Sequence, residues 1–174
     1  MSRGFVKEDD LELAGTDLPE RPISNAKNYV TANGYAQLQK QLSQLDSQRQ
    51  MLCQHKEDAT AKQKLAMVER DLRYVATRLE SAIVAIPSEQ ASSEQTTEGT
   101  NQVLFGATVT VENEDGQQQR YEIVGEDEAD IHHNKVSWIS PLAKALLGSK
   151  VGDTVTWVRP VGNALLEIIS IEYD

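Results

Sequence analysis

A chain of 174 residues is long enough for one large domain or two small ones. Because only 39 % of the residues are hydrophobic and only two are Phe, we do not expect one large core. The single cysteine, Cys53, rules out an internal disulfide and is typical of a reducing cytosol. No apolar run approaches the ~20 residues of a membrane span, and no signal peptide is evident, so we expect a cytoplasmic protein with no membrane partner.

The net charge of −10 is unevenly distributed along the sequence. Residues 87–174 contain fifteen acidic and five basic residues, whereas residues 31–86 contain six acidic and eight basic ones. The C-terminal half therefore repels nucleic acid, and any phosphate contact has to come from the middle of the chain. This distribution argues against an autonomous DNA-binding protein.

Residues 1–28 predict an arm without regular structure. A charge run from Lys7 to Glu12 is followed by a proline-containing stretch from Leu18 to Pro22, and neither shows a helical or strand period. The arm is either a flexible tail or a segment that becomes ordered on a partner.

Residues 29–86 predict an antiparallel helical hairpin with a coiled-coil seam. Apolar side chains recur at spacings of three, four and seven in two stripes, the first being Tyr35, Leu38, Leu42, Leu45 and Leu52, the second Leu65, Val68, Leu72, Val75, Leu79 and Ala82. Thr31 is a suitable N-cap for the first helix, and Pro87 stops the second. The turn is expected within residues 54–60, but it contains neither Gly nor Pro, so one continuous helix remains an alternative.

Residues 87–102 are almost entirely polar and predict a flexible linker, which is the clearest domain boundary. After the linker the apolar period changes to two. Residues 107–111 and 120–124 flank Asp115-Gly116, a strong hairpin signal, and two further strands are expected at residues 155–157 and 165–171. Residues 103–174 therefore predict a small antiparallel sheet with one short helix, so the fold class of the chain is α+β.

The short helix lies in residues 139–153. Ser140 is a good N-cap, Pro141 occupies the first helical position, where its missing N–H costs nothing, and Gly148 can end the helix. Leu142 lies on the face that can pack against the sheet.

This stretch resembles the C-terminal signature of the bacterial Gre-type transcript cleavage factors, Ser-Pro-x-Ala/Gly-Lys/Arg-Ala-Leu-x-Gly followed by Gly-Asp. The likeness continues at the helix start in residues 29–38, the returning helix in residues 70–80, the segment at 105–111 and the last strand at 166–173. It covers the chain from residue 29 onward, so the arm and the long linker are additions.

The resemblance implies an FKBP-like C-terminal domain that docks at the rim of the secondary channel of bacterial RNA polymerase. On this basis the docking residues are Trp138, Ile139, Ser140, Pro141, Leu142 and Ala143. The hairpin of such factors threads into the channel, where acidic tip residues help to hold a second Mg²⁺ in the polymerase active site. The factor is then an accessory and not an enzyme, with no cofactor of its own.

The tip departs from the family pattern. No Asp-x-x-Glu-Asn motif occurs in the hairpin, and Glu57 and Asp58 are the acidic residues nearest the turn. Each helix of the hairpin looks about two helical turns, or roughly 10 Å, shorter than in typical members. Since a carboxylate binds Mg²⁺ at ~2 Å, the resemblance predicts weak or absent cleavage stimulation with an effect on elongation or pausing. The alternatives are an active cleavage factor that uses Glu57 and Asp58, or simple helix-start chemistry in which Asp58 or Thr60 caps the second helix.

Basic residues gather in the second helix, namely Lys62, Lys64, Arg70, Arg73 and Arg78. By resemblance they form a patch near the RNA 3′ segment, whereas the interleaved Glu69 and Asp71 favour an ordinary solvated helix. The pair His132-His133 has no evident third ligand and predicts a loop, so no metal site is expected.

Two further function classes stay open. A prolyl isomerase needs an aromatic-lined pocket, but the aromatic residues of the C-terminal domain occupy positions that suit core packing; they are Phe105, Tyr121, Trp138, Trp157 and Tyr173. A coiled-coil adaptor would close the seam of residues 31–86 between two chains. The expected state is a monomer whose partners are RNA polymerase and nascent RNA.

Overall fold

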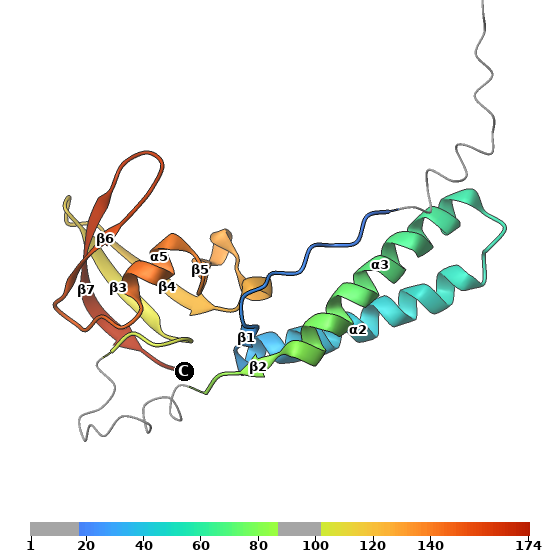
Figure 1. Cartoon of the computed structure of the whole chain (residues 1–174), viewed down its shortest axis with the longest axis horizontal. Helices are drawn as coiled ribbons and strands as arrows, with labels where there is room; N and C mark the ends of the chain where they lie inside the picture. The colour runs from blue at the N-terminus through green and yellow to red at the C-terminus, as the bar shows by residue number, and fades with distance from the viewer. Residues whose placement is uncertain (1–17, 87–101) are drawn as a thin grey trace, which may run out of the picture. The chain divides into compact units, whose positions relative to one another are not determined.

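The computed structural model describes residues 18–86 and 102–174 (Figure 1). Most of the predicted linker and the first seventeen residues of the predicted arm lie outside these ranges. Within the described ranges, no helix combines the length and the apolar composition that crossing a membrane requires.

The chain divides into two compact units, which we describe separately. Among the described residues, the hairpin unit comprises residues 18–25 and 36–81. The C-terminal unit comprises residues 26–35 together with the described residues from 82 onward. The first turn of the first helix therefore belongs to the C-terminal unit.

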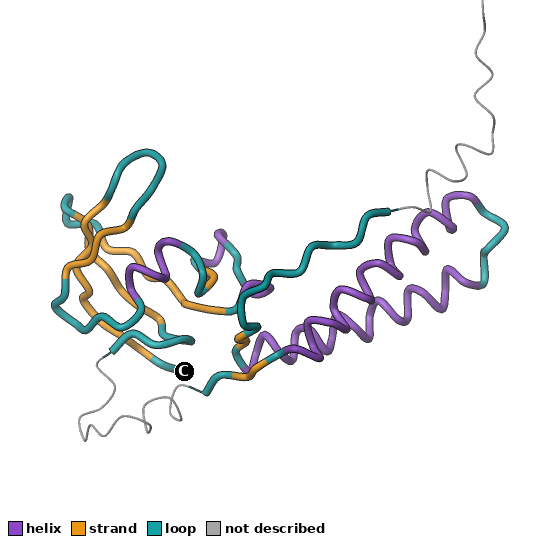
Figure 2. The backbone as a smooth tube through the Cα atoms, viewed as in Figure 1, coloured by secondary structure: helices purple, strands orange, loops and turns teal. Residues whose placement is uncertain are grey.

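Two long helices form the predicted hairpin, so the continuous helix is excluded (Figure 2). Helix α2 spans Ala32–Cys53 and helix α3 spans Ala59–Ser81. Residues 54–57 form the turn. Asp58 caps α3, because its Oδ1 accepts the N–H of Thr60 at 2.9 Å.

The large side chains of the seam are buried most deeply away from the turn. Leu38 of α2 and Val75 of α3 are buried. Nearer the turn, Leu45, Leu52 and Val68 are only half-buried. The predicted seam is present, but its half next to the turn leaves apolar surface open.

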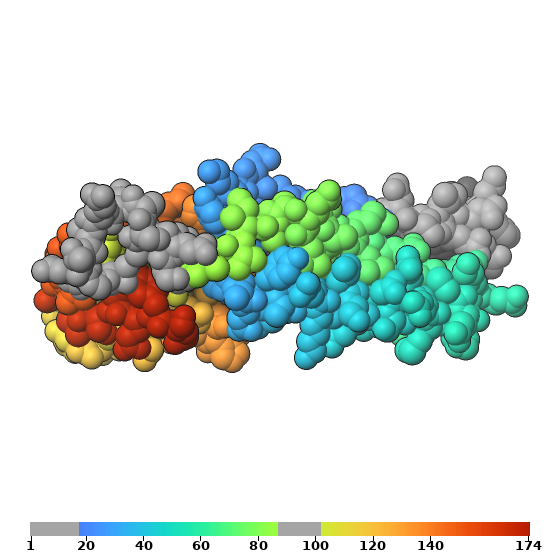
Figure 3. Space-filling model, turned by 90° about the horizontal axis from the view of Figure 1, so that it is seen from below, coloured from blue at the N-terminus to red at the C-terminus, as the bar shows by residue number. Residues whose placement is uncertain are grey.

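The described part of the arm lies against α3, which differs from the free segment that its composition predicts (Figure 3). Arg73 donates to Glu20 with a distance of 3.0 Å from Nε to Oε1, and this bond lowers the pKa of the Glu20 carboxyl. The guanidinium of Arg21 stacks over the ring of Tyr74 at 3.8 Å and lies 3.6 Å from Asp71. Composition could not show this arrangement, because the paired residues are about fifty positions apart in the sequence.

A five-stranded sheet with the order β5-β4-β3-β7-β6 is the framework of the C-terminal unit. The strands span Thr108–Asn113 (β3), Gln118–Val124 (β4), Lys135–Ser137 (β5), Thr154–Trp157 (β6) and Ala164–Glu172 (β7). Gly116 in the β3–β4 turn has a φ of +74°, a conformation that favours glycine. The hairpin predicted around Asp115-Gly116 is confirmed.

Helix α5, Pro141–Leu146, closes the core of this sheet. Its buried side chains meet those of the strands, among them Leu142, Ala143, Leu146, Val109, Val111, Ile123 and Ile168. The Oγ of Ser140 accepts the N–H of Ala143 at 3.2 Å, and Gly148 has a φ of +84°. The predicted start and stop of this helix are therefore confirmed.

The sheet is mixed, and not wholly antiparallel as predicted. Strands β4 and β5 pair in parallel, because the chain between them makes two short 3-10 helices, η1 at Glu126–Glu128 and η2 at Ile131–His133, before it re-enters the sheet. A second parallel pair joins β1, Tyr29–Val30, to β2, Ile83–Val84. Strands of two or three residues carry too few alternating positions for the sequence pattern to reveal them.

Tyr173, directly after β7, connects the end of this strand to residues 102–104. Its hydroxyl accepts the N–H of Leu104 at 3.0 Å and donates to the carbonyl of Gln102. We expect Tyr173→Phe to lower the free energy of unfolding by about 1 kcal/mol at neutral pH, because both hydrogen bonds are lost. Urea unfolding followed by Trp fluorescence measures the change.

At alkaline pH, Tyr173→Phe is expected to lose less stability with rising pH than the natural protein does. Burial raises the pKa of the Tyr173 hydroxyl above its usual value, so the unfolded chain ionises first as the pH rises above about 10. The free energy of unfolding of the natural protein therefore falls with rising pH in this range. Burial also raises the pKa of Tyr121, which leaves a residual effect in the variant. If the free energy of unfolding of the variant fell with rising pH as steeply as that of the natural protein, this role of Tyr173 would be contradicted.

Candidate functional site

The turn of the hairpin carries the two predicted acidic residues, and both Glu57 and Asp58 are exposed. The Asp58 carboxylate is engaged by the N–H of Thr60, as the capping interpretation predicts. In the described part of the chain, no group of three His, Cys, Asp or Glu side chains is placed to hold a metal ion. Mg²⁺ demands octahedral oxygen ligands and is often shared with substrate phosphates. The two carboxylates of the turn therefore cannot supply a full set of metal ligands by themselves.

The predicted docking stretch divides into a buried and an accessible part. Leu142 is 4 % exposed and Ala143 is fully buried. Both belong to the core cluster around α5, so their side chains are not accessible in this structure for the predicted contact with a partner. The accessible members are Pro141 and, in part, Trp138, Ile139 and Ser140. The structure adds Lys144, which is exposed one turn after Pro141 and was not predicted.

An aromatic cluster holds Trp138 beside this loop. Tyr29 meets Trp138 edge-on with 5.1 Å between ring centroids, and it meets Phe105 at 5.9 Å. The backbone N–H of Trp138 donates to the carbonyl of Val124 at 2.9 Å. The indole Nε1 is buried and has no hydrogen-bond partner among the described residues. Ring packing and the backbone bond, and not the indole donor, therefore position the loop that presents Pro141.

Glu128 is a buried polar residue that the sequence analysis did not identify. Its Oε2 accepts the N–H of Thr31 at 3.0 Å and the N–H of Gly125 at 3.0 Å, and its Oε1 accepts the Thr31 hydroxyl. The Thr31 Oγ1 in turn accepts the N–H of Gly34 at 3.0 Å, which confirms Thr31 as the N-cap of α2. A carboxylate is favoured at a helix N-terminus by the unpaired N–H groups and the helix dipole. Glu128 thus fastens the first turn of α2 to η1 within the C-terminal unit.

The basic residues of α3 do not form the single patch that was predicted. Arg78 is 2 % exposed, so its side chain is not accessible in this structure for the predicted contact with RNA. Arg70 lies 3.1 Å from Asp71, and Arg73 is paired with Glu20 of the arm. These arginines are engaged within the hairpin unit.

Lys62 and Lys64 are exposed. They are two positions apart, which is about 200° around the helix, so they face different sides of α3. The basic residues that remain accessible are therefore dispersed, as in an ordinary solvated helix.

The adjacent histidines lie in the exposed turn η2. The Nδ1 of His133 is 2.6 Å from Oδ2 of Asp130, and this contact lowers the pKa of the Asp130 carboxyl. Asp130 also caps η2 by accepting the N–H of His132 at 2.9 Å. The predicted loop is therefore a short capped turn.

The aromatic side chains of the C-terminal unit pack as core residues. Phe105 is buried, and Tyr121 meets Trp157 edge-on with 6.4 Å between centroids. Trp138, Trp157 and Tyr173 are half-buried against the core. This arrangement matches the core packing expected from their positions.

Known proteins resemble this chain along most of its length. A family model described as "Transcription elongation factor, GreA/GreB, C-term" matches residues 97–173. Transcription elongation factor GreB of Neisseria meningitidis serogroup B is 36 % identical over 164 residues, covering 86 % of this chain and 96 % of that protein. GreA of Francisella philomiragia is 36 % identical over 115 residues, covering 65 % of this chain and 67 % of that protein.

Among solved structures, the GreA factor homolog Gfh1 of Thermus thermophilus is 24 % identical, with a TM-score of 0.39 over 84 % of this chain and 99 % of that one. The family assignment rests on the sequence relatives, because the GreB protein is similar across both the hairpin and the C-terminal unit. With 36 % identity over nearly the full length of a GreB protein, the chain belongs to the GreA/GreB family of transcription elongation factors.

Proposed function

We propose that the protein binds RNA polymerase at the rim of its secondary channel through the C-terminal unit and inserts its short hairpin into the channel. It modulates elongation or pausing, with weak or absent stimulation of transcript cleavage. Family membership supports polymerase as the partner, because the relatives are transcription elongation factors. The observation that carries the proposal is the length of the hairpin, whose two helices have 22 and 23 residues.

The accessible part of the docking stretch supports a protein partner. Pro141 and Lys144 are exposed on a loop and helix that the core and the aromatic cluster hold in place. The ten-charge acidic excess of residues 87–174 disfavours nucleic acid at this surface. A protein surface with an apolar depression for Pro141 and an acidic group for Lys144 fits this part of the molecule.

The dimensions of the hairpin support weak cleavage. Its helices have 22 and 23 residues, which corresponds to about 33 to 35 Å each. The resemblance implies longer hairpin helices in typical members, so the turn of this hairpin stops short of the catalytic metal. Asp58 also keeps its carboxylate turned to the Thr60 N–H.

Cleavage of backtracked RNA in stalled elongation complexes tests the proposal. We expect the protein to bind the complexes and to change the pausing pattern, with a cleavage rate close to that of polymerase alone. Glu57→Gln/Asp58→Asn is the matched variant, because Asn retains a capping oxygen while both charges are removed. This variant should act like the natural protein in every assay.

Robust cleavage by the natural protein that Glu57→Gln/Asp58→Asn abolishes would contradict the reach argument. It would assign the chain to the active cleavage factors instead. Absence of binding to polymerase would refute the partner itself.

A further inference from the structure

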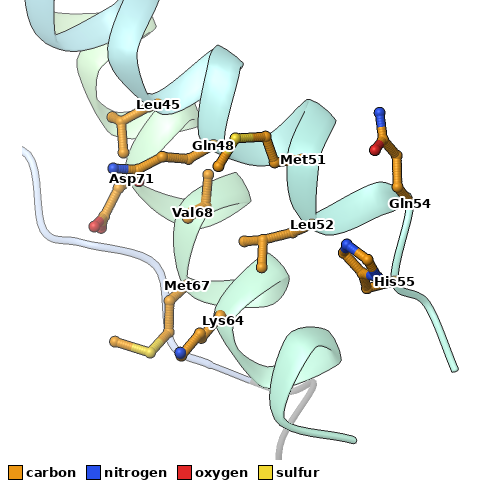
Figure 4. A pocket seen from close by; sticks show the side chains of 10 residues that line it. All are labelled: Leu45, Gln48, Met51, Leu52, Gln54, His55, Lys64, Met67, Val68 and Asp71. Atoms are coloured by element: carbon orange, nitrogen blue, oxygen red, sulfur yellow. The ribbon is translucent and has the colours of Figure 1, made fainter. Parts of the chain in front are cut away.

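An apolar groove lies between α2 and α3 near the turn of the hairpin (Figure 4). It encloses about 620 Å³, and the apolar members of its lining are Leu45, Met51, Leu52, Met67 and Val68. Met51 is 64 % exposed and Met67 is 49 % exposed, so both side chains are available to another surface. Covering apolar surface stabilises an assembly by about 25 cal/mol per Å², and methionine side chains adapt readily to the shape of a partner.

Two opposite charges lie on the α3 side of this groove. Lys64 and Asp71 both line it and are seven positions apart, so they lie on one face of α3 with Met67 and Val68 midway between them. Lys64 is exposed and has no ion-pair partner among the described residues. Two arginines contact Asp71 through Oδ1, at 3.6 and 3.1 Å, so Oδ2 can still accept from a further donor.

This arrangement of charges is complementary to itself. A two-fold axis that runs across the mouth of the groove, perpendicular to both helices, places a second α3 antiparallel to the first. When the axis passes over the midpoint between Met67 and Val68, Lys64 of each copy lies opposite Asp71 of the other. Met67 of each copy then lies opposite Val68 of the other. The lining of α3 therefore forms two charge pairs around an apolar centre.

The α2 side of the groove allows the same arrangement. Leu45 and Leu52 also line the groove and are also seven positions apart, so an antiparallel α2 of a second copy brings Leu52 opposite Leu45. Gln48, which is uncharged, lies nearest the axis. Both helices therefore match their own copies under one operation. This complementarity favours a second copy of the chain over an unrelated protein.

The size of the surface predicts how strongly two copies associate. On average about fourteen residues of each helix overlap around the axis, which is about 20 Å of helix, and two helices side by side are about 20 Å wide. The contact therefore covers roughly 400 Å² per copy, which is about half of a standard stable interface. We expect such a dimer to exchange with its monomer, so the monomer expected from the resemblance is the state at low concentration.

We propose that two copies of the chain associate through this groove as an antiparallel pair of hairpins, with Lys64 of each copy opposite Asp71 of the other. The product is a four-helix arrangement that covers the apolar lining of both grooves. A paired hairpin is thicker than a single one, so self-association lowers the concentration of hairpins that can enter a channel. Only this consequence rests on the proposed function. The dimer is measured without polymerase, so failure of one and failure of the other are distinguishable.

Charge reversal in mixed samples tests the pairing. Lys64→Glu places two carboxylates opposite each other at both ends of the interface, and Asp71→Lys places two ammonium groups there. We expect each variant alone to raise the dissociation constant of the dimer by about tenfold or more in sedimentation equilibrium. An equimolar mixture of the two variants restores an opposite pair at both ends and should form a dimer with nearly the natural affinity. Since the mixture contains the same altered chains, damage within one chain cannot explain this recovery.

The methionines provide a second measurement, because the sequence contains only Met1, Met51 and Met67. In methyl-¹³C-methionine NMR of the full chain, we expect the signals of Met51 and Met67 to shift with rising protein concentration. In Lys64→Glu both signals should stay at the positions of the dilute natural protein. Ile131→Ser is the matched control, because it alters an apolar residue that is 85 % exposed in the other unit. Its concentration dependence should equal that of the natural protein.

The single Cys53 provides a third measurement on the natural arrangement of charges. A nitroxide attached to it gives one spin label per chain, so pulsed EPR detects a distance only between two chains. A monomeric mass and no such distance between about 10 µM and about 1 mM, the range expected for a small interface, would overturn the proposal. A dimer that Lys64→Glu and Asp71→Lys leave intact would also overturn it, and so would a mixture of these variants that stays monomeric.

Discussion

Replacing Glu128 with alanine is expected to lower the free energy of unfolding of the C-terminal unit by about 3 kcal/mol. The change leaves the N–H groups of Thr31 and Gly125 without their acceptor and removes a carboxylate from the N-terminus of α2. Urea unfolding followed by Trp fluorescence measures the loss selectively, because Trp138 and Trp157 both lie in this unit. Glu114→Gln, at an exposed position in the β3–β4 turn, is the control and should have little effect.

Gly34→Ala tests the same contact from its other side. Alanine is about 1 kcal/mol better than glycine within a helix, so helix propensity alone predicts a gain. A Cβ at Gly34 would lie 2.0 Å from Cδ of Glu128, however, and the carboxylate would have to move. We therefore expect a loss of about 2 kcal/mol. In the Glu128→Ala background the same substitution should become neutral or stabilising, and an equal effect in both backgrounds would contradict the contact.

Leu142→Asp is expected to abolish folding of the C-terminal unit, with a loss of at least about 4 kcal/mol. A buried leucine is removed and an unpaired carboxylate takes its place in the core. Trp fluorescence and circular dichroism should show the loss directly. Failure of this variant to bind polymerase would then report on folding and not on docking.

Pro141→Asp/Lys144→Glu is the variant that separates docking from folding. Both side chains are exposed, and an acidic residue in the first turn of a helix is favoured by the helix dipole. The unfolding midpoint should stay near that of the natural protein, while retention of the full chain on immobilised polymerase should fall by about tenfold, which is 1.4 kcal/mol. Retention at the natural level would remove this loop from the proposed docking surface.

Local sequence signals predicted the elements that local chemistry controls. The cap at Thr31, the spacing of leucines in the two helices and the Asp115-Gly116 turn each act within a few residues, and the structure contains all three features. The Ser140 to Gly148 signals likewise place α5. Such features need no knowledge of distant partners, because helix caps and tight turns are satisfied by neighbouring backbone groups.

Residue type and spacing left open which of these residues are accessible. Leu142 belongs to a motif that suggests contact with a partner, yet the face of α5 that carries it is the face that covers the sheet. Arg78 is charged, yet it is buried in the hairpin unit. Burial depends on what packs opposite a residue, which one sequence does not specify.

By itself, the sequence determined the two helices, the change to a strand period after residue 102 and the family. Only the tertiary structure decided that β5 joins the sheet in parallel, that Glu128 meets Thr31 across 97 positions of sequence, and that the arm lies along α3. The physical reason is the range of the interactions. Periodicity and capping repeat within one or two turns of chain, whereas a buried carboxylate and an ion-paired arm are stabilised by groups that only the folded chain brings together.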